Sequence, residues 1–195
     1  MDSYLKHYIN GKWVDSIGGK RHEVISPSTE EPCTEITLGT QADVDAAVSA
    51  ARQAFKTFSQ TSREERVALM NRIIEEYKKR IPDFAKSMAA EMGAPVSFAT
   101  MAQAPAGLGG FLGTLPALEN FAFKEQHGAN TVVYEPIGVV GLITPWNWPL
   151  NQIALKVAPC IAAGNTMVLK PSEECPGNAA IFAEVMDAAG VPPGV

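Results

Sequence analysis

The stretch "GVVGLITPWNWPLNQIALKVAPCIAAGNTMVLKPSE", residues 138–173, contains the pattern that decides the fold. The apolar run "GVVGLI" and the segment "NTMVLK" (165–170) are typical of strands, and the residues between them, 151–163, have the spacing of a helix. The connection between Ile143 and Thr166 is long enough for a right-handed crossover, so we predict two parallel strands. The predicted fold class is α/β.

The preceding sequence predicts β structure followed by helices. Asn10-Gly11, within "HYINGKWVD" (7–15), is the signal of a two-residue hairpin turn. Further strands are expected at "HEVISP" (22–27) and "CTEITLGT" (33–40), and within "GANTVVYEPIGVVGLITP" (128–145), where Glu135-Pro136 separates two of them. Helices are predicted over 42–58, 62–80, 83–92 after a break at Pro82, 95–123 and 178–189.

The composition is that of an ordinary globular protein. The 195 residues are 46% hydrophobic and 19% charged, with a formal net charge of -5. This balance argues against nucleic acid or an anionic membrane as the main partner, and no apolar run is long enough to span a membrane. The first residues do not resemble a signal peptide, and three cysteines without close pairing favour a reduced, cytoplasmic chain.

Each predicted strand of the parallel pair ends in a loop that could carry chemistry. The two loops, "TPWNWP" (144–149) and "KPSEECP" (170–176), should meet at the edge of the sheet where open α/β sheets bind ligands. In the first loop the amide of Asn147 could donate a hydrogen bond to an oxygen that becomes negatively charged during a reaction, or it could simply cap the following helix. Trp146 and Trp148 could contact a ligand, although core packing is the commoner role.

In the second loop, Lys170 and Glu173 present a cation and a carboxylate within one turn. A ribose diol suits this pair, because the carboxylate accepts from hydroxyl groups and the ammonium donates to them. The alternative is a solvated surface ion pair that contributes little to stability.

The remaining motifs give weaker evidence of function. "GLGGFLG" (107–113) departs from the dinucleotide-binding glycine pattern and follows no strand, so we expect it to allow close helix packing. The three histidines have no metal-binding spacing, and no metal site is expected. Cys160 is expected in the core, whereas Cys175 is expected to be more exposed, just before a helix N-terminus that could lower its pKa.

In this order, "YINGKWVDS", "SPSTEEPCTEITLGTQADVDAAVSAARQAF", "EPIGVVGLITPWNWPLNQIALKVAPCIAAGNTMVLKPSEECP" and "AGVPPGV" resemble the N-terminal part of the aldehyde dehydrogenase superfamily. The resemblance covers nearly the whole chain. It implies an N-terminal β-hairpin and helices leading into a Rossmann-like parallel sheet that ends before the sheet is complete. Residues 1–195 would then be an incomplete cofactor-binding domain, with the catalytic domain absent from this chain.

The resemblance also implies a role for each candidate residue. Asn147 would donate its amide to the aldehyde oxygen as that oxygen becomes an oxyanion. Trp146 and the backbone of Ile143 and Thr144 would line the nicotinamide side of the cofactor site, while Lys170 and Glu173 would hold the adenosine ribose. A carboxylate near the ribose 2′ position would repel a phosphate, so NAD is expected rather than NADP.

The activity implied by the resemblance is NAD-dependent oxidation of an aldehyde to an acid through a thiohemiacetal on a cysteine. That cysteine and the glutamate base lie beyond this chain in the family, so residues 1–195 alone are expected to be inactive. The strand at about 129–136 matches the family's oligomerisation strand, which implies a homodimer or homotetramer. Phe111, Leu112 and Leu115 suggest a hydrophobic entrance for the aldehyde, with ordinary helix packing as the alternative.

Two other functions compete with this reading. The chain could be a non-catalytic cofactor-binding or interaction module, or Cys175 could supply thiol chemistry of its own. The presence of Asn147, Lys170 and Glu173 together favours the dehydrogenase, since a scaffold has no need of them.

Overall fold

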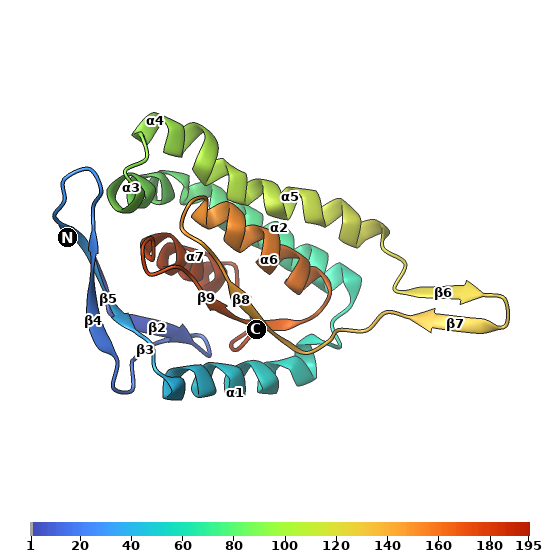
Figure 1. The fold of residues 1–195 in the computed structure, drawn as a ribbon. Helices are drawn as coiled ribbons and strands as arrows, with labels where there is room; N and C mark the ends of the chain where they lie inside the picture. Colours follow the sequence, from blue (N-terminus) through green and yellow to red (C-terminus); the bar gives the residue numbers. More distant parts are fainter. Residues whose placement is uncertain (1) are drawn as a thin grey trace.

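A parallel strand pair lies at the centre of the computed structural model, which describes residues 2–195 (Figure 1). Strand β8 (Val139–Ile143) pairs in parallel with β9 (Thr166–Lys170), and helix α6 (Pro149–Ala162) makes the crossover between them. The register runs from Val139 opposite Thr166 to Ile143 opposite Lys170. The predicted α/β class and the parallel pairing are confirmed.

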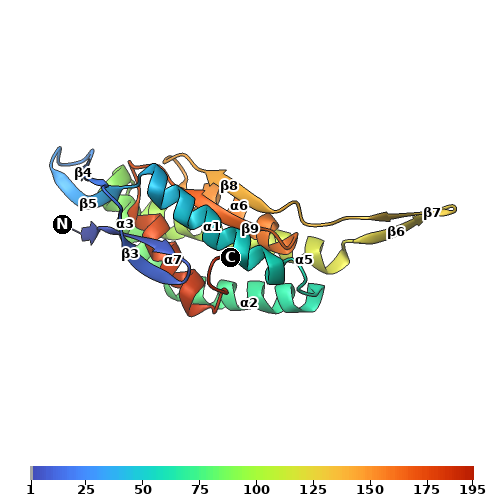
Figure 2. The same cartoon turned by 90° about the horizontal axis from the view of Figure 1, so that it is seen from below.

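Helices cover both faces of this strand pair (Figures 1 and 2). Helix α1 (Gln41–Phe58) packs on one face, where the Thr166 hydroxyl donates to the Ala51 carbonyl at 2.9 Å. On the other face, α6 packs with α2 (Arg63–Lys79), α5 (Ala104–Asn120) and α7 (Gly177–Ala188), and α3 (Ile81–Met92) packs against α5 and α7. The largest fully buried side chains come mainly from these helices and include Tyr77, Phe84, Phe111, Met70, Leu150 and Ile153.

The N-terminal residues form the predicted hairpin and a small sheet. Strands β2 (Lys6–Ile9) and β3 (Lys12–Asp15) are joined by Asn10 and Gly11, whose φ angles of 53° and 73° suit a two-residue hairpin turn. Strands β4 (Lys20–Ile25) and β5 (Pro32–Leu38) match the predicted strands, and β1 (Asp2–Tyr4) completes the order β1-β5-β4. Strand β1 was not predicted, because a strand of three residues is too short to show an alternation of polar and apolar side chains.

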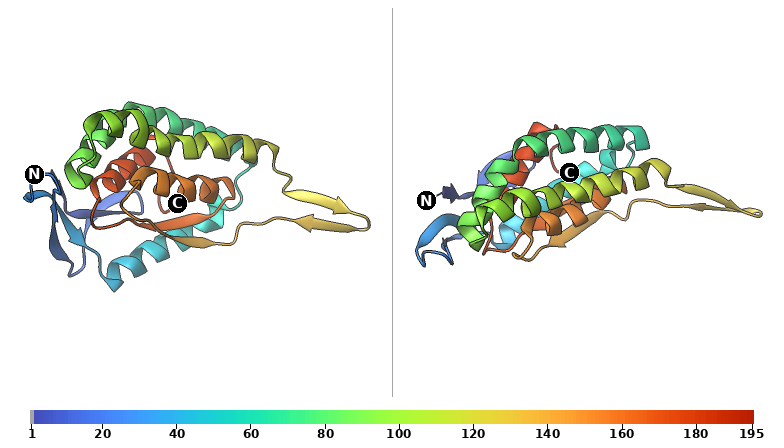
Figure 3. Two further views of the ribbon diagram at one scale, coloured as in Figure 1. Left: turned by 45° about the horizontal axis from the view of Figure 1, so that its top comes forward. Right: turned by 90° about the horizontal axis from the view of Figure 1, so that it is seen from above.

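A second hairpin projects from the body of the molecule in every view (Figures 1 and 3). It pairs β6 (Lys124–His127) with β7 (Asn130–Val133). Strand β7 falls within the expected strand at 129–136, whereas β6 was missed because "KEQH" has no apolar pattern.

The helical region predicted over 95–123 is interrupted by a wider turn. It consists of α4 (Val96–Phe98), a π-helical turn η1 (Ala99–Gln103) and α5, and the N–H of Ala104 donates to the Ala99 carbonyl five residues back. Pro105 follows, and a proline lacks the N–H that a regular helix would use and crowds the carbonyl four residues before it. The proline therefore accounts for the widening.

Helix α3 begins two residues before the predicted start. Pro82 lies within its first turn, where the missing N–H needs no partner, rather than in a break before the helix. Its end at Gly93, which has a φ of 69°, is as predicted.

Two glycines of "GLGGFLG" allow α5 to approach its neighbours closely, as expected for this motif. A Cβ added at Gly107 would lie 2.2 Å from the Tyr77 hydroxyl oxygen and 2.9 Å from Leu150 Cβ. A Cβ added at Gly110 would lie 2.9 Å from Ala154 Cβ, whereas one at Gly109 would meet nothing within 4 Å. A side chain at Gly107 or Gly110 would therefore force a neighbouring group to shift, whereas one at Gly109 would not.

We predict that Gly110→Ala lowers the free energy of unfolding by about 1–3 kcal/mol, because the methyl group overpacks the contact between α5 and α6. The matched control is Gly109→Ala on the same helix, which should raise stability by up to about 1 kcal/mol through helix propensity. Urea unfolding followed by circular dichroism measures both. Equal effects at the two positions would contradict this account of the packing.

Candidate functional site

The carboxyl ends of β8 and β9 bring the two predicted loops together. Ile143 lies opposite Lys170 in the ladder, and the Thr144 N–H donates to the Lys170 carbonyl at 3.2 Å. The prediction that both loops leave the same edge of the sheet is confirmed.

The loop "TPWNWP" leads directly into α6. Helix α6 begins at Pro149 and its N-cap residue is Trp148, so the alternative in which Asn147 caps the helix is wrong. The Asn147 side chain is exposed, and the Trp146 ring next to it is 53% exposed. This amide is therefore displayed at the surface of the chain, not enclosed in an apolar pocket built by residues 2–195.

Two residues of the π-helical region contact this loop. The Gln103 side chain is buried, and its Nε2 donates to the backbone carbonyl of Asn147 at 3.4 Å. The Phe98 ring packs edge-to-face against Trp148 with the ring centroids 5.8 Å apart. Sequence reasoning missed both residues, since nothing in the pattern shows that the helix widens here.

The second loop carries the predicted ion pair. Lys170 Nζ lies 2.7 Å from Glu173 Oε2, and about half of each side chain is exposed. The hydrogen bond from Lys170 lowers the pKa of Glu173, so this carboxylate is ionised at neutral pH. The pair can present an acceptor and a donor to a diol.

A buried glutamate anchors the far end of this loop. Both carboxylate oxygens of Glu91, on α3, accept from the N–H of Gly177 at 3.1 Å, at the first residue of α7. Oε2 also accepts from the Ser87 hydroxyl at 3.3 Å. Burial raises the pKa of Glu91 despite these hydrogen bonds. Glu91 falls on the same helix face as Phe84 and Met88, and this position is the one sequence feature that indicates its burial.

The environment of Cys175 corrects the prediction made for it. Its side chain is buried, with 2% exposed, and Asn178 Nδ2 donates to its sulfur at 3.3 Å. Burial and the adjacent Glu91 carboxylate raise the pKa of the thiol far above its usual value, so the helix N-terminus does not activate it. Cys160 is buried as predicted, which raises its pKa to about 11.

Phe111 also differs from the prediction. Its ring is fully buried and lies 6.1 Å from the Phe182 ring, so it belongs to the core and not to a substrate entrance. Leu115 packs against the same core, whereas Leu112 is 49% exposed.

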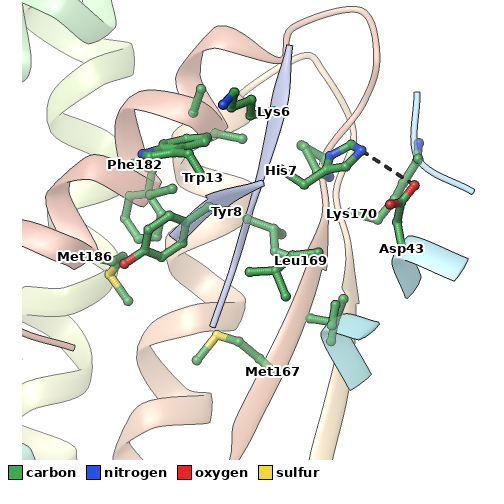
Figure 4. A pocket seen from close by; sticks show the side chains of 18 of the residues that line it. Lys6, His7, Tyr8, Trp13, Asp43, Met167, Leu169, Lys170, Phe182 and Met186 are labelled. Atoms are coloured by element: carbon green, nitrogen blue, oxygen red, sulfur yellow. Dashed lines mark ion pairs between the residues drawn. The ribbon is translucent and has the colours of Figure 1, made fainter. Parts of the chain in front are cut away.

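A cavity of about 630 Å³ lies beside the second loop (Figure 4). Strands β2 and β3, the side of β9 and helix α7 form its walls, and Lys170 and Glu173 lie among the residues that line it. Figure 4 shows apolar side chains such as Met167, Leu169 and Phe182 facing this space. Trp146 and Asn147 are not among the residues that line it.

Two features are absent from the described residues. Within residues 2–195, no helix is long and apolar enough to cross a membrane. Over the same part of the chain, no group of three or more histidine, cysteine, aspartate or glutamate side chains could hold a metal ion.

Comparison with known proteins agrees with this geometry. A model of the aldehyde dehydrogenase family matches residues 13–195. A 3-succinoylsemialdehyde-pyridine dehydrogenase from a Pseudomonas species is 50% identical over all of this chain, which spans 41% of that protein. The crystal structure of an aldehyde dehydrogenase from Bartonella henselae is 46% identical with a TM-score of 0.96, covering 100% of this chain and 42% of that one.

A mutant of aldehyde dehydrogenase C from Pseudomonas syringae, solved with NAD+ and octanal, is 44% identical with a TM-score of 0.95 over 97% of this chain and 39% of that chain. The chain belongs to the aldehyde dehydrogenase family. It spans about two fifths of the length of the relatives that it matches. The predicted family and fold are thus confirmed.

The raised pKa of Glu91 predicts a pH dependence of stability. Because the folded state favours the protonated carboxyl, the stability that this group contributes is present below its usual pKa of 4.5 and is lost as pH rises through the folded value. Relative to Glu91→Gln, the wild-type chain should therefore lose free energy of unfolding above this pH, by at most about 1.4 kcal/mol per pH unit.

Urea unfolding across this pH range tests the prediction, with the exposed Glu64→Gln as the control. A pH-independent difference between wild type and Glu91→Gln would show that the carboxyl does not titrate differently in the folded state.

Proposed function

We propose that this chain is part of an enzyme that oxidises an aldehyde to a carboxylic acid with NAD as the hydride acceptor. The observation that carries the proposal is the meeting of the Asn147 loop with the Lys170–Glu173 pair at one edge of the β8–β9 sheet. Family membership supports aldehyde oxidation in general, and the relative solved with NAD+ and octanal supports the cofactor and the substrate class.

In this proposal the residues of the chain bind NAD and orient it. The Glu173 carboxylate accepts from the hydroxyls of the adenosine ribose, and Lys170 donates to them. The negative charge of Glu173 favours a free 2′ hydroxyl over a 2′ phosphate, which makes NAD the expected cofactor. The exposed Trp146 ring, together with the backbone of Ile143 and Thr144, borders the nicotinamide, which accepts the hydride when NAD is bound.

Asn147 stabilises the charge that develops on the substrate. When a cysteine thiolate adds to the aldehyde carbon, the C=O electron pair moves to oxygen, and the amide donates a hydrogen bond to the resulting oxyanion. NAD, when bound, would take up the hydride of this adduct to give a thioester, and a water activated by a glutamate would then release the acid and free the thiol. The cysteine and the glutamate are proposed to lie beyond residue 195, because none of the three cysteines of this chain matches the family's nucleophile motif.

The projecting hairpin is proposed as the oligomerisation element. Val132, Val133 and Tyr134 are exposed one after another along this segment, which gives it a continuous apolar surface that a partner can cover. A homodimer or homotetramer of the full-length protein would cover them.

We predict that residues 1–195 alone form no NADH from any aldehyde, because the nucleophile and the base are missing. The full-length protein should form NADH in an aldehyde-dependent manner, which absorbance or fluorescence of the product measures. A full-length protein that binds NAD but turns over no aldehyde would instead favour the non-catalytic cofactor-binding alternative.

In the full-length protein, Asn147→Ala should lower kcat by about 10²- to 10³-fold, as loss of an oxyanion donor does in other enzymes. Steady-state kinetics with a saturating aldehyde measure this change. Asn71→Ala, at an exposed position on α2, is the matched control and should leave kcat unchanged. Unchanged turnover in Asn147→Ala would remove the proposed role of this amide.

A further inference from the structure

The loop that carries Asn147 is held by two side chains from one region of the neighbouring helix. Gln103, which is only 5% exposed, donates to the Asn147 carbonyl at 3.4 Å, and Phe98 packs edge-to-face on Trp148. One contact therefore falls on the residue that carries the proposed oxyanion donor, and the other falls on the residue after it.

The π-helical turn explains how both residues reach the same loop. In a regular α-helix, Phe98 and Gln103, five residues apart, would point about 140° away from each other. In the turn at Ala99–Gln103 the backbone bond spans five residues, which brings positions five apart closer to one face. The widened turn before Pro105 thus allows both the Phe98 ring and the Gln103 amide to contact the loop "TPWNWP".

The burial of Gln103 indicates that its amide has a specific purpose. Its Oε1 atom is buried and has no hydrogen-bond partner within residues 2–195. An apolar side chain of similar size, such as methionine, would avoid this unsatisfied acceptor and pack equally well. The bond to the Asn147 carbonyl is the one hydrogen bond that the Gln103 side chain makes within residues 2–195.

We propose that Gln103 is a positioning residue that fixes the Asn147 backbone and thereby the direction of the Asn147 amide. Its role in the reaction rests on the function proposed above. Pro145 and Pro149 stiffen the two ends of the loop, but neither fixes the peptide group of Asn147 itself. The buried amide of Gln103 supplies that constraint, and Phe98 limits movement of the adjacent Trp148.

Whether Gln103 restrains the loop can be tested in residues 1–195 by a measurement that needs no enzymatic activity. In a Trp13→Phe, Trp146→Phe background, Trp148 is the sole tryptophan and reports on the loop. Gln103→Met should increase acrylamide quenching of Trp148 by about twofold, because the loop opens more often. The matched control, Gln53→Met, replaces an exposed glutamine on α1 and should leave quenching unchanged.

Gln103→Asn serves as a second variant. The asparagine side chain is too short for its amide to reach the Asn147 carbonyl, and it is smaller than glutamine, whereas methionine is of similar size. Far-UV circular dichroism and urea unfolding confirm that the variants are folded. Increased quenching in both folded variants supports the proposal. Quenching equal to that of the Gln53→Met control overturns it.

Kinetics of the full-length protein test the role in the reaction. Gln103→Met should lower kcat by about 10-fold or more through misplacement of the donor, with the KM values for aldehyde and NAD changed by less than about twofold. In an Asn147→Ala background the same substitution should cause no further loss, because Gln103 acts through Asn147.

Fully additive losses, or an effect on KM alone, would overturn the positioning role. If Asn147→Ala itself leaves turnover unchanged, the proposed oxyanion function fails, and with it the catalytic part of this inference. The Trp148 measurement then still decides whether Gln103 holds the loop, so the two failures are distinguishable.

Discussion

The parallel pairing of β8 with β9 is the constraint on which the rest of the structure depends. Its register places Ile143 beside Lys170 and lets the Thr144 N–H donate to the Lys170 carbonyl. Two loops separated by the 14-residue helix α6 and strand β9 therefore leave the sheet as neighbours. Helices lie on both faces of the pair, although only Leu142 and Thr166 among its residues are buried.

Much of this arrangement could be predicted from the sequence because it depends on local patterns. The apolar runs before "TPWNWP" and "KPSE", the helical spacing between them and the Asn10-Gly11 turn each follow from short-range preferences. The two candidate loops were thus found correctly. The assignment of Asn147, Trp146, Lys170 and Glu173 to particular functions came from family resemblance and remains a prediction.

What the sequence did not reveal depends on contacts between distant segments. Cys175 was expected to be more exposed than Cys160, yet it is buried beside Glu91, which lies 84 positions earlier in the chain and accepts from the N–H of Gly177. Phe111 was interpreted as part of a hydrophobic entrance on the basis of the family resemblance. Gly107 and Gly110 instead let α5 approach its neighbours closely, and the ring is buried. Neither of these contacts can be predicted from the hydrophobic periodicity of the sequence.

The π-helical turn before Pro105 has a consequence for comparing related chains. A π turn accommodates one residue more than an α turn does, so it changes the rotational phase of everything that follows on the helix. A homologue with one residue fewer at 99–103 could close the turn to a regular helix and keep α5 packed on α6. Such a deletion would preserve the core while removing the Gln103 contact from the loop, so a single alignment gap here would separate relatives by the support of the Asn147 loop and not by fold.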